Sequence, residues 1–154
     1  MSNYLINAEY RCYNYLLDKL GGLDGVNGYM GKFPRRSGEV DGLREWAFAI
    51  TGEDENLAEL QNVGEGARQS NGLSCTITGR FTDRVEALRF AGELMELGTV
   101  SFDNVQYFGH NSGEVPEIVP EVFNVGDTGY ELDGWMVEYK MLAVVDRVDE
   151  PDAM

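Results

Sequence analysis

The sequence is poor in lysine, histidine and cysteine, and it contains no long apolar run. Three lysines stand among 154 residues, and 27 acidic residues outweigh 12 lysines and arginines, which gives a formal net charge of −15. Such a chain repels nucleic acid as a whole, because phosphate affinity needs clustered cations. No apolar run approaches the roughly 20 residues that a membrane-spanning helix needs, and the polar N-terminus does not resemble a signal peptide. These features predict a soluble, non-secreted protein.

The few nucleophilic or metal-binding side chains are scattered along the chain. Cys12 and Cys75 lack a metal-ligand spacing, so each is predicted to be a small core residue. His110 stands alone in the turn-like YFGHNSGE, without the strained G-x-S-x-G elbow of a hydrolase. NGYMGKF fails as a phosphate loop, because Val26 stands where the first glycine belongs and Phe33 replaces the Ser or Thr. We therefore predict no enzyme activity, no cofactor and no metal site.

The acidity has two interpretations. Abundant acids with scarce lysine resemble the composition of proteins from salt-loving organisms. A negative surface can also have a use, such as a passage along which DNA moves without sticking. The acid-rich segment 127–133 does not fit an EF-hand, because Leu132 stands where the loop needs glycine. A looser carboxylate site for a hard cation stays open.

Two amphipathic helices are predicted. The first spans residues 3–20, and its apolar stripe needs a sheet or a neighbour to cover it; the stripe consists of Ile6, Tyr10, Tyr13, Leu17 and Leu20. The second begins after an N-cap at Asp83, with Glu86 completing a capping box, and runs to about residue 97. Its predicted dry face consists of Val85, Leu88, Ala91, Leu94 and Met95.

Alternating segments predict strands at residues 44–51, 73–81, 100–102, 105–108, 118–125 and 134–146. In the second of these, Leu73, Cys75 and Ile77 should face the helices and Ser74, Thr76 and Thr78 should face away. Pro120 argues for an edge strand or a bulge, and the Gly-rich segment 21–42 is predicted to be a connection. The chain is thus predicted to be α+β, a mainly antiparallel sheet with two helices on one face in the order α-β-β-α-β-β. One domain should span residues 1–148, followed by a flexible acidic tail at 149–154.

Arg35 and Arg36 form the only cationic cluster. Arginine is the preferred partner of carboxylates across an interface, so identical acidic subunits in a ring could use this pair to offset a neighbour's charge. An exposed turn that merely aids solubility is the alternative. Residues predicted to contact another subunit or partner are Phe33, Pro34, Arg35, Arg36, Ser74, Thr76, Thr78, His110 and Asn111.

The pattern of elements resembles that of the tail-terminator, or tail-completion, proteins of long-tailed phages. Four segments carry the likeness across most of residues 3–146: the helix ending LLDKLGG, the KFPRR entry into REWAFAIT, the unit CTITGRFTDRVEALRFAGELMELG, and the final strand GWMVEYKMLAVV. The resemblance implies a virion structural protein that forms a ring, typically hexameric, on the head-proximal end of the tail tube. Residues 98–134 are longer and more broken than the simplest form of the pattern, which leaves other neck or tube proteins open.

The resemblance also implies the partners and the location. The chain would bind copies of itself, the tail tube protein and the head–tail connector. DNA would pass through the ring without specific binding. It would reside in the tail or neck of the virion, and in the host cytoplasm during assembly. The competing interpretation is a small α+β domain that binds a ligand or another partner, or an enzyme with an unidentified catalytic carboxylate.

Overall fold

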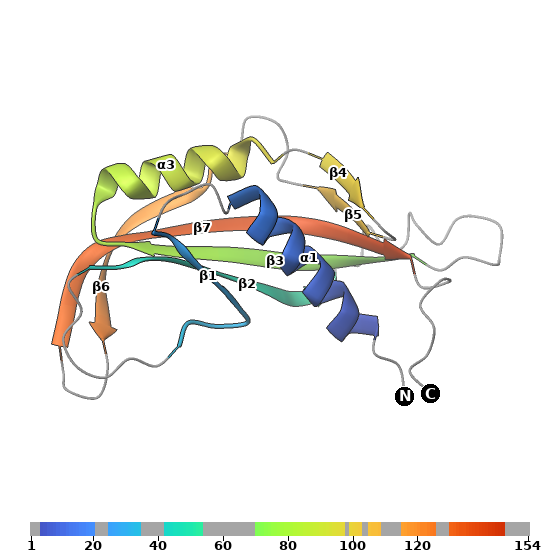
Figure 1. The fold of residues 1–154 in the computed structure, drawn as a ribbon, viewed down its shortest axis with the longest axis horizontal. Helices are drawn as coiled ribbons and strands as arrows, with labels where there is room; N and C mark the ends of the chain where they lie inside the picture. Colours follow the sequence, from blue (N-terminus) through green and yellow to red (C-terminus); the bar gives the residue numbers. More distant parts are fainter. Residues whose placement is uncertain are drawn as a thin grey trace.

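The computed structural model describes residues 4–20, 25–34, 42–53, 70–97, 99–102, 105–108, 115–125 and 130–146. Within these ranges the chain is α+β, as predicted, with a sheet and two helices (Figure 1). The elements are α1 (Tyr4–Leu20), β1 (Asn27–Met30), β2 (Arg44–Glu53), β3 (Ser70–Phe81), α3 (Arg84–Met95), β4 (Thr99–Phe102), β5 (Val105–Phe108), β6 (Glu117–Val125) and β7 (Tyr130–Asp146). The predicted tail at 149–154 lies outside the described residues.

The sheet is mainly antiparallel and is built around β7. Its order is β1-β2-β3-β7-β5-β4, and β6 pairs with β7 as well. β3 lies along one side of β7 over residues 135–146, while β6 pairs with residues 130–138 and β5 with residues 142–145 on the other side. Residues 130–134 of β7 therefore pair with β6 beyond the end of β3, and the two strands form a projecting hairpin at the left of Figure 1.

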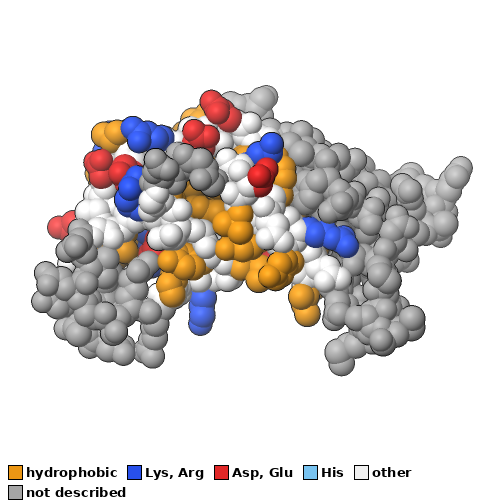
Figure 2. Space-filling model, viewed as in Figure 1, with side chains coloured by type: hydrophobic (Ala, Val, Ile, Leu, Met, Phe, Trp, Pro, Cys, Tyr) orange, Lys and Arg blue, Asp and Glu red, His pale blue; other side chains and the backbone are white. Residues whose placement is uncertain are grey.

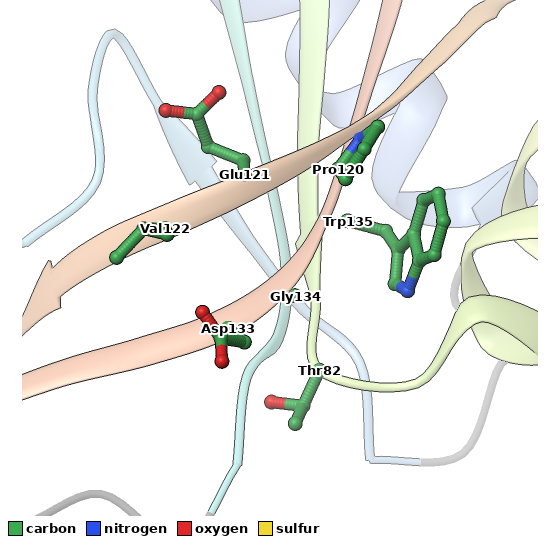
Figure 3. Close-up of a pocket in the computed structure, with 7 residues that line it drawn as sticks. All are labelled: Thr82, Pro120, Glu121, Val122, Asp133, Gly134 and Trp135. Carbon is green, nitrogen blue, oxygen red and sulfur yellow. The ribbon is translucent and has the colours of Figure 1, made fainter.

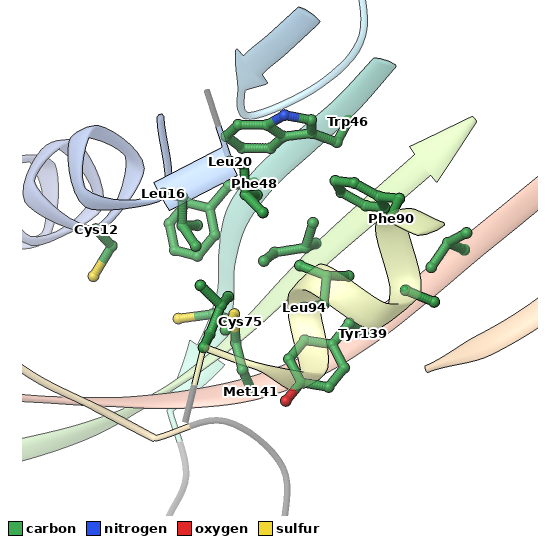
Figure 4. Close-up of a cluster of buried hydrophobic side chains, with 14 of the residues drawn as sticks. Cys12, Leu16, Leu20, Trp46, Phe48, Cys75, Phe90, Leu94, Tyr139 and Met141 are labelled. Carbon is green, nitrogen blue, oxygen red and sulfur yellow. The ribbon is translucent and has the colours of Figure 1, made fainter. Parts of the chain in front are cut away.

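Both helices cover the same face of the sheet, as predicted. Alternate residues of β2, β3 and β7 meet the helices in one apolar cluster (Figure 4). Every second residue of a strand points to the same face, so the period-two pattern of the sequence becomes the floor of the core. The strand residues buried in this cluster are Trp46, Phe48, Leu73, Cys75, Ile77, Phe81, Val137, Tyr139 and Met141.

The face that α1 presents to the core differs in part from the one that the sequence predicted: Leu20 is buried and Tyr13 packs against the core, as predicted, whereas the other three residues of the stripe are exposed. Its buried residues are Ala8, Cys12, Leu16 and Leu20. Ile6, Tyr10 and Leu17, which were predicted to face inward, are exposed, and Figure 2 shows hydrophobic side chains gathered at the centre of the face that carries α1. The prediction was wrong here because α1 is apolar on two faces. The face with the small residues Ala8 and Cys12 lies on the sheet, where they let the helix approach closely.

The α3 helix also differs in part from the prediction. Its buried residues are Ala87, Phe90, Ala91 and Leu94, so Val85, Leu88 and Met95 are exposed rather than dry. Asp83 is the N-cap, as predicted, and accepts a hydrogen bond from the Val85 N–H. The Glu86 carboxylate, however, accepts a 2.6 Å hydrogen bond from Arg44 Nε of β2 instead of closing a capping box. This charged contact fixes the start of α3 against the sheet.

The Gly-rich segment after α1 contains a strand that the sequence did not reveal. Residues 27–30 form β1, which pairs in parallel with β2. Gly28 lies against the Trp46 ring so closely that a Cβ atom would overlap it. Beyond β1 the edge of β2 is covered by α1, where the Glu9 carboxylate accepts a 3.0 Å hydrogen bond from the Ile50 N–H.

Gly79 provides a test of the packing between β3 and α3. A Cβ atom at Gly79 would lie 2.7 Å from a ring carbon of Phe81 and 2.9 Å from one of Phe90. We expect Gly79→Ala to lower the free energy of unfolding by about 1–3 kcal/mol, as overpacking of a core does. Gly52→Ala is the matched control, because a Cβ there meets nothing within 4 Å. Urea unfolding of both variants checks this; equal midpoints would contradict the packing described.

The two thiols provide a second test. Burial raises the pKa of the Cys12 thiol from 9.0 to about 12, and it raises the pKa of the Cys75 thiol as well. Only the thiolate is nucleophilic, so a disulfide reagent at pH 8 should label neither cysteine until the chain is unfolded in urea. The thiol pKa values of the folded protein lie above the value of 9.0 for an unfolded chain. The free energy of unfolding should therefore be unaffected by the thiols below pH 9.0 and should fall as the pH rises toward 12. Rapid labelling of the native protein would contradict this burial.

Candidate interaction face of the sheet

The face of the sheet opposite the helices carries short side chains. Ser74, Thr76 and Thr78 of β3 are half-buried there, as predicted, while their neighbours Leu73, Cys75 and Ile77 are buried beneath the helices. Thr76 and Thr78 lie beside Ala49 and Ala47 of β2 on one side, and beside Lys140 and Glu138 of β7 on the other. Within the described part of the chain, the three hydroxyls make no side-chain hydrogen bond, so they are available to a partner or to water. We call this surface the hydroxyl face.

A buried ion pair lies at one end of the hydroxyl face. Arg80 continues the row of β3 and lies opposite Glu45 of β2 in the strand register. Its Nη2 atom lies 2.5 Å from Glu45 Oε1, and its Nε atom donates to the same oxygen at 3.1 Å. The Glu45 side chain is 1% exposed and that of Arg80 is 17% exposed. Desolvating a carboxylate costs several kcal/mol, and the close Arg80 guanidinium offsets part of this cost for Glu45.

Aromatic rings enclose the Arg80 guanidinium. Its central carbon lies 3.9 Å from the centroid of Phe33 and 5.4 Å from that of Phe123. Phe33 follows Gly31, whose positive φ of 89° reverses the chain after β1; glycine adopts this conformation without strain. Phe123 of β6 packs with Leu43 in a small second core. Arg80 thus joins three segments distant in sequence: the chain after β1, the end of β3 and the β6–β7 hairpin.

The structure brings several of the predicted contact residues together. Phe33 lies at the Arg80 end of the hydroxyl face, so it shares this surface with Ser74, Thr76 and Thr78, and the exposed Pro34 follows it. The other predicted contact residues lie outside the described residues: Arg35, Arg36, His110 and Asn111.

A groove of about 540 Å³ lies where the β6–β7 hairpin meets the start of α3 (Figure 3). It is lined by Thr82, Pro120, Glu121, Val122, Asp133, Gly134 and Trp135. Pro120 lies in β6, which pairs with β7 alone among the described strands, as expected for proline in an edge strand. The Arg84 guanidinium stands 5.4 Å from the centre of the Trp135 ring. The groove therefore combines apolar walls with the Asp133 carboxylate.

Sequence reasoning missed the ion pair and the groove for a physical reason. Glu45 and Arg80 are each visible as the charged end of a period-two row, but only the pairing register brings them together. The groove needs the hairpin, Thr82 and Trp135 in one place, and no spacing in the sequence encodes that. The aromatic residues Trp46 and Tyr139 are buried in the core, and Trp135 packs against its edge.

The described residues form no metal-binding cluster. No three His, Cys, Asp or Glu side chains within these ranges come together in a way that could hold a metal ion. None of the described helices is long and apolar enough to cross a membrane. What the hydroxyl face can do chemically is pack against another surface and exchange hydrogen bonds with it.

Comparison with known proteins adds no relative. No protein-family model matches the sequence, and no curated protein matches it.

The Arg80–Glu45 pair makes a direct prediction. Arg80→Met should lower the free energy of unfolding by about 3–5 kcal/mol, because it removes the guanidinium that lies against the buried Glu45 carboxylate. Glu45→Met combined with Arg80→Met should recover much of this loss, since both charges of the pair are then removed. Lys140→Met is the control: this lysine is 70% exposed and lies 4.0 Å from Glu138, so its loss should cost less than about 1 kcal/mol. Thermal and urea unfolding measure all three, and an Arg80→Met variant as stable as the control would contradict the assignment.

Proposed function

We propose that this protein is a virion structural subunit, a tail terminator that forms a ring on the head-proximal end of a tail tube and joins the tube to the head connector. It acts by assembly, without catalysis. The fold agrees with the α+β architecture on which the resemblance to that family rests, including two helices on one face of a mainly antiparallel sheet. The role itself is our inference from the surface described above.

The observation that carries the proposal is the uncovered hydroxyl face. No helix in the described structure covers this face. Ser74, Thr76, Thr78 and Ala49 are partly exposed there, whereas Ala47 and Glu45 are buried, so another protein could contact the β3 row directly. Thr is favourable on a strand surface that is partly exposed to solvent, so contact with water alone would explain this row. A neighbouring subunit or the lumen of a ring is the occupant that we propose.

The charge of the chain supports the same proposal. At a net charge of −15, a ring of identical subunits would present a strongly negative lumen, past which DNA could move without being held. The same charge makes copies repel one another, so assembly depends on surfaces with a favourable local balance. Salt at 0.1 M would screen the repulsion between charges that are more than about 10 Å apart. Such screening also fits a virus of a salt-loving host.

The groove favours a second candidate function. Apolar walls with polar groups are typical of binding sites, and the groove at Trp135 has Pro120 and Val122 in its walls and the Asp133 carboxylate beside Val122 (Figure 3). A small α+β domain that binds a cationic ligand or partner protein would use this groove. Another neck or tube protein is the alternative within the virion. Mass measurement separates the assembly proteins from a monomeric binding domain.

The hydroxyl face gives the test. Replacing Ser74, Thr76 and Thr78 by Lys should leave the monomer folded, because all three side chains point away from the core, yet it should disrupt assembly. Light scattering would give the mass of the purified chain, and sedimentation with isolated tail tubes would report joining. The control Glu93→Gln/Glu96→Gln/Glu131→Gln raises the net charge by the same amount away from this face, and it should assemble normally.

Two results would contradict the proposal at different points. Normal rings from the triple Lys variant would show that Ser74, Thr76 and Thr78 face solvent and do not contact another subunit. A wild-type chain that stays strictly monomeric and also fails to join tail tubes would remove the tail-terminator role altogether. Circular dichroism on each variant confirms that loss of assembly is not loss of folding.

A further inference from the structure

The groove at Trp135 presents an aromatic ring and a carboxylate on the same face of the sheet. Trp135 lies opposite Pro120 in the β6–β7 register, and Asp133 lies opposite Val122. Paired residues, and residues two apart along a strand, share a face, so these four side chains point to the side on which Trp135 packs against the core. Figure 3 shows the Asp133 carboxylate beside Val122, whereas the Glu121 side chain points to the other side of β6. Asp133 is therefore the carboxylate that a ligand in the groove would meet.

The Asp133 carboxylate has no counterion within the described part of the chain. It is exposed, and it makes no ion pair or hydrogen bond with another described residue. Three further glutamates and no lysine or arginine stand in residues 117–125 and 130–134. A groove in this acidic hairpin attracts cations and repels anions.

The aromatic wall of the groove favours a guanidinium among cations. The chain has an example at this ring, because the central carbon of the Arg84 guanidinium lies 5.4 Å from the centroid of Trp135, although Arg84 does not line the groove. Arg80 lies over Phe33 in the same way, at 3.9 Å. A guanidinium is planar, stacks on aromatic rings and is more weakly hydrated than an ammonium. It can therefore enter between apolar walls and still bind a carboxylate through two parallel hydrogen bonds.

The groove has room for a side chain together with the backbone beside it. Its volume of about 540 Å³ lies within the range of about 300–1,000 Å³ that is typical of ligand sites. Pro120 and Val122 form apolar walls, and Val122 is 53% exposed. An arginine side chain would lay its aliphatic stem along these walls while its charged end reaches Asp133.

We propose that this groove binds an arginine-bearing segment of a partner protein, with the guanidinium against the Trp135 ring and paired with the Asp133 carboxylate. The groove lies on the helix side of the sheet, whereas the hydroxyl face lies on the opposite side. Both surfaces can be occupied at once, so this contact does not replace the one proposed for the hydroxyl face. The inference names the ligand of the second candidate function and rests on that function's use of the groove.

A peptide titration tests this contact without requiring assembly. The probe is acetyl-Val-Arg-Val-amide, and its matched control carries citrulline, which keeps the shape of arginine and lacks its charge. The chain contains two tryptophans, so labelling with fluorotryptophan gives two fluorine NMR signals, and Trp135→Phe identifies them. Arginine peptide at about 10 mM, enough to occupy most of a site with a dissociation constant of about 1 mM, should shift the Trp135 signal. The Trp46 signal should stay in place because Trp46 is buried, and the citrulline peptide should shift neither signal.

Two variants separate the groove carboxylate from the general acidity of the hairpin. Asp133→Asn should weaken binding of the arginine peptide by about tenfold or more, because a hydrogen bond between two charged groups is lost. Glu121→Gln removes the same charge from the same hairpin, but its side chain points away from the groove (Figure 3), and salt screens an exposed charge. Its affinity should stay within about twofold of the wild type. Both residues are exposed, so both variants should fold.

Three results would overturn the proposal. They are a Trp135 signal that does not move at this peptide concentration, an equal shift with the citrulline peptide, and equal affinities of Asp133→Asn and Glu121→Gln. A wild-type chain that stays monomeric and fails to join tail tubes would remove the tail-terminator role without changing the titration. The proposed function and this inference can therefore fail separately.

Discussion

The pairing of β3 with β7 is the constraint on which the rest of the molecule depends. It joins residues 70–81 to residues 135–146 without a register shift. A shift of one residue would exchange the two faces, placing the hydroxyls of β3 under the helices and Cys75 and Ile77 in water. The same ladder leaves the first residues of β7 to the hairpin, while the separate register between β2 and β3 sets Arg80 beside Glu45. The core, the hydroxyl face and the groove thus all depend on how β3 is paired.

Electrostatics limits how this chain can associate. Most of its surface opposes contact between copies, because acids outnumber cations by more than two to one. The described cations are largely used within the chain: Arg44 binds Glu86, Arg80 binds Glu45, and Arg84 stands over Trp135. Under the proposed assembly, attraction between copies would come from apolar area and from local neutrality more than from ion pairs.

The sequence allowed the class, the helix bounds and the two faces of β3 to be predicted, because these follow from local periodicity and capping. The prediction failed where the sequence allowed two arrangements of one segment equally well. Either face of α1 could lie on the sheet, and only the close approach allowed by Ala8 and Cys12 decided between them. It also failed where a glycine concealed a strand, since Gly28 marks a backbone passing under Trp46 and not a flexible link. The candidate site was half predictable: the hydroxyl row was visible, whereas its Arg80 end required the register.

The Glu9 carboxylate has a consequence for solubility. β1 ends at Met30 and leaves the next part of β2 open, and an open edge invites pairing with strands of other molecules. By accepting the hydrogen bond from Ile50, Glu9 blocks this edge with a helix that carries its own apolar stripe. The same helix therefore protects this edge of the sheet from uncontrolled strand pairing with other molecules.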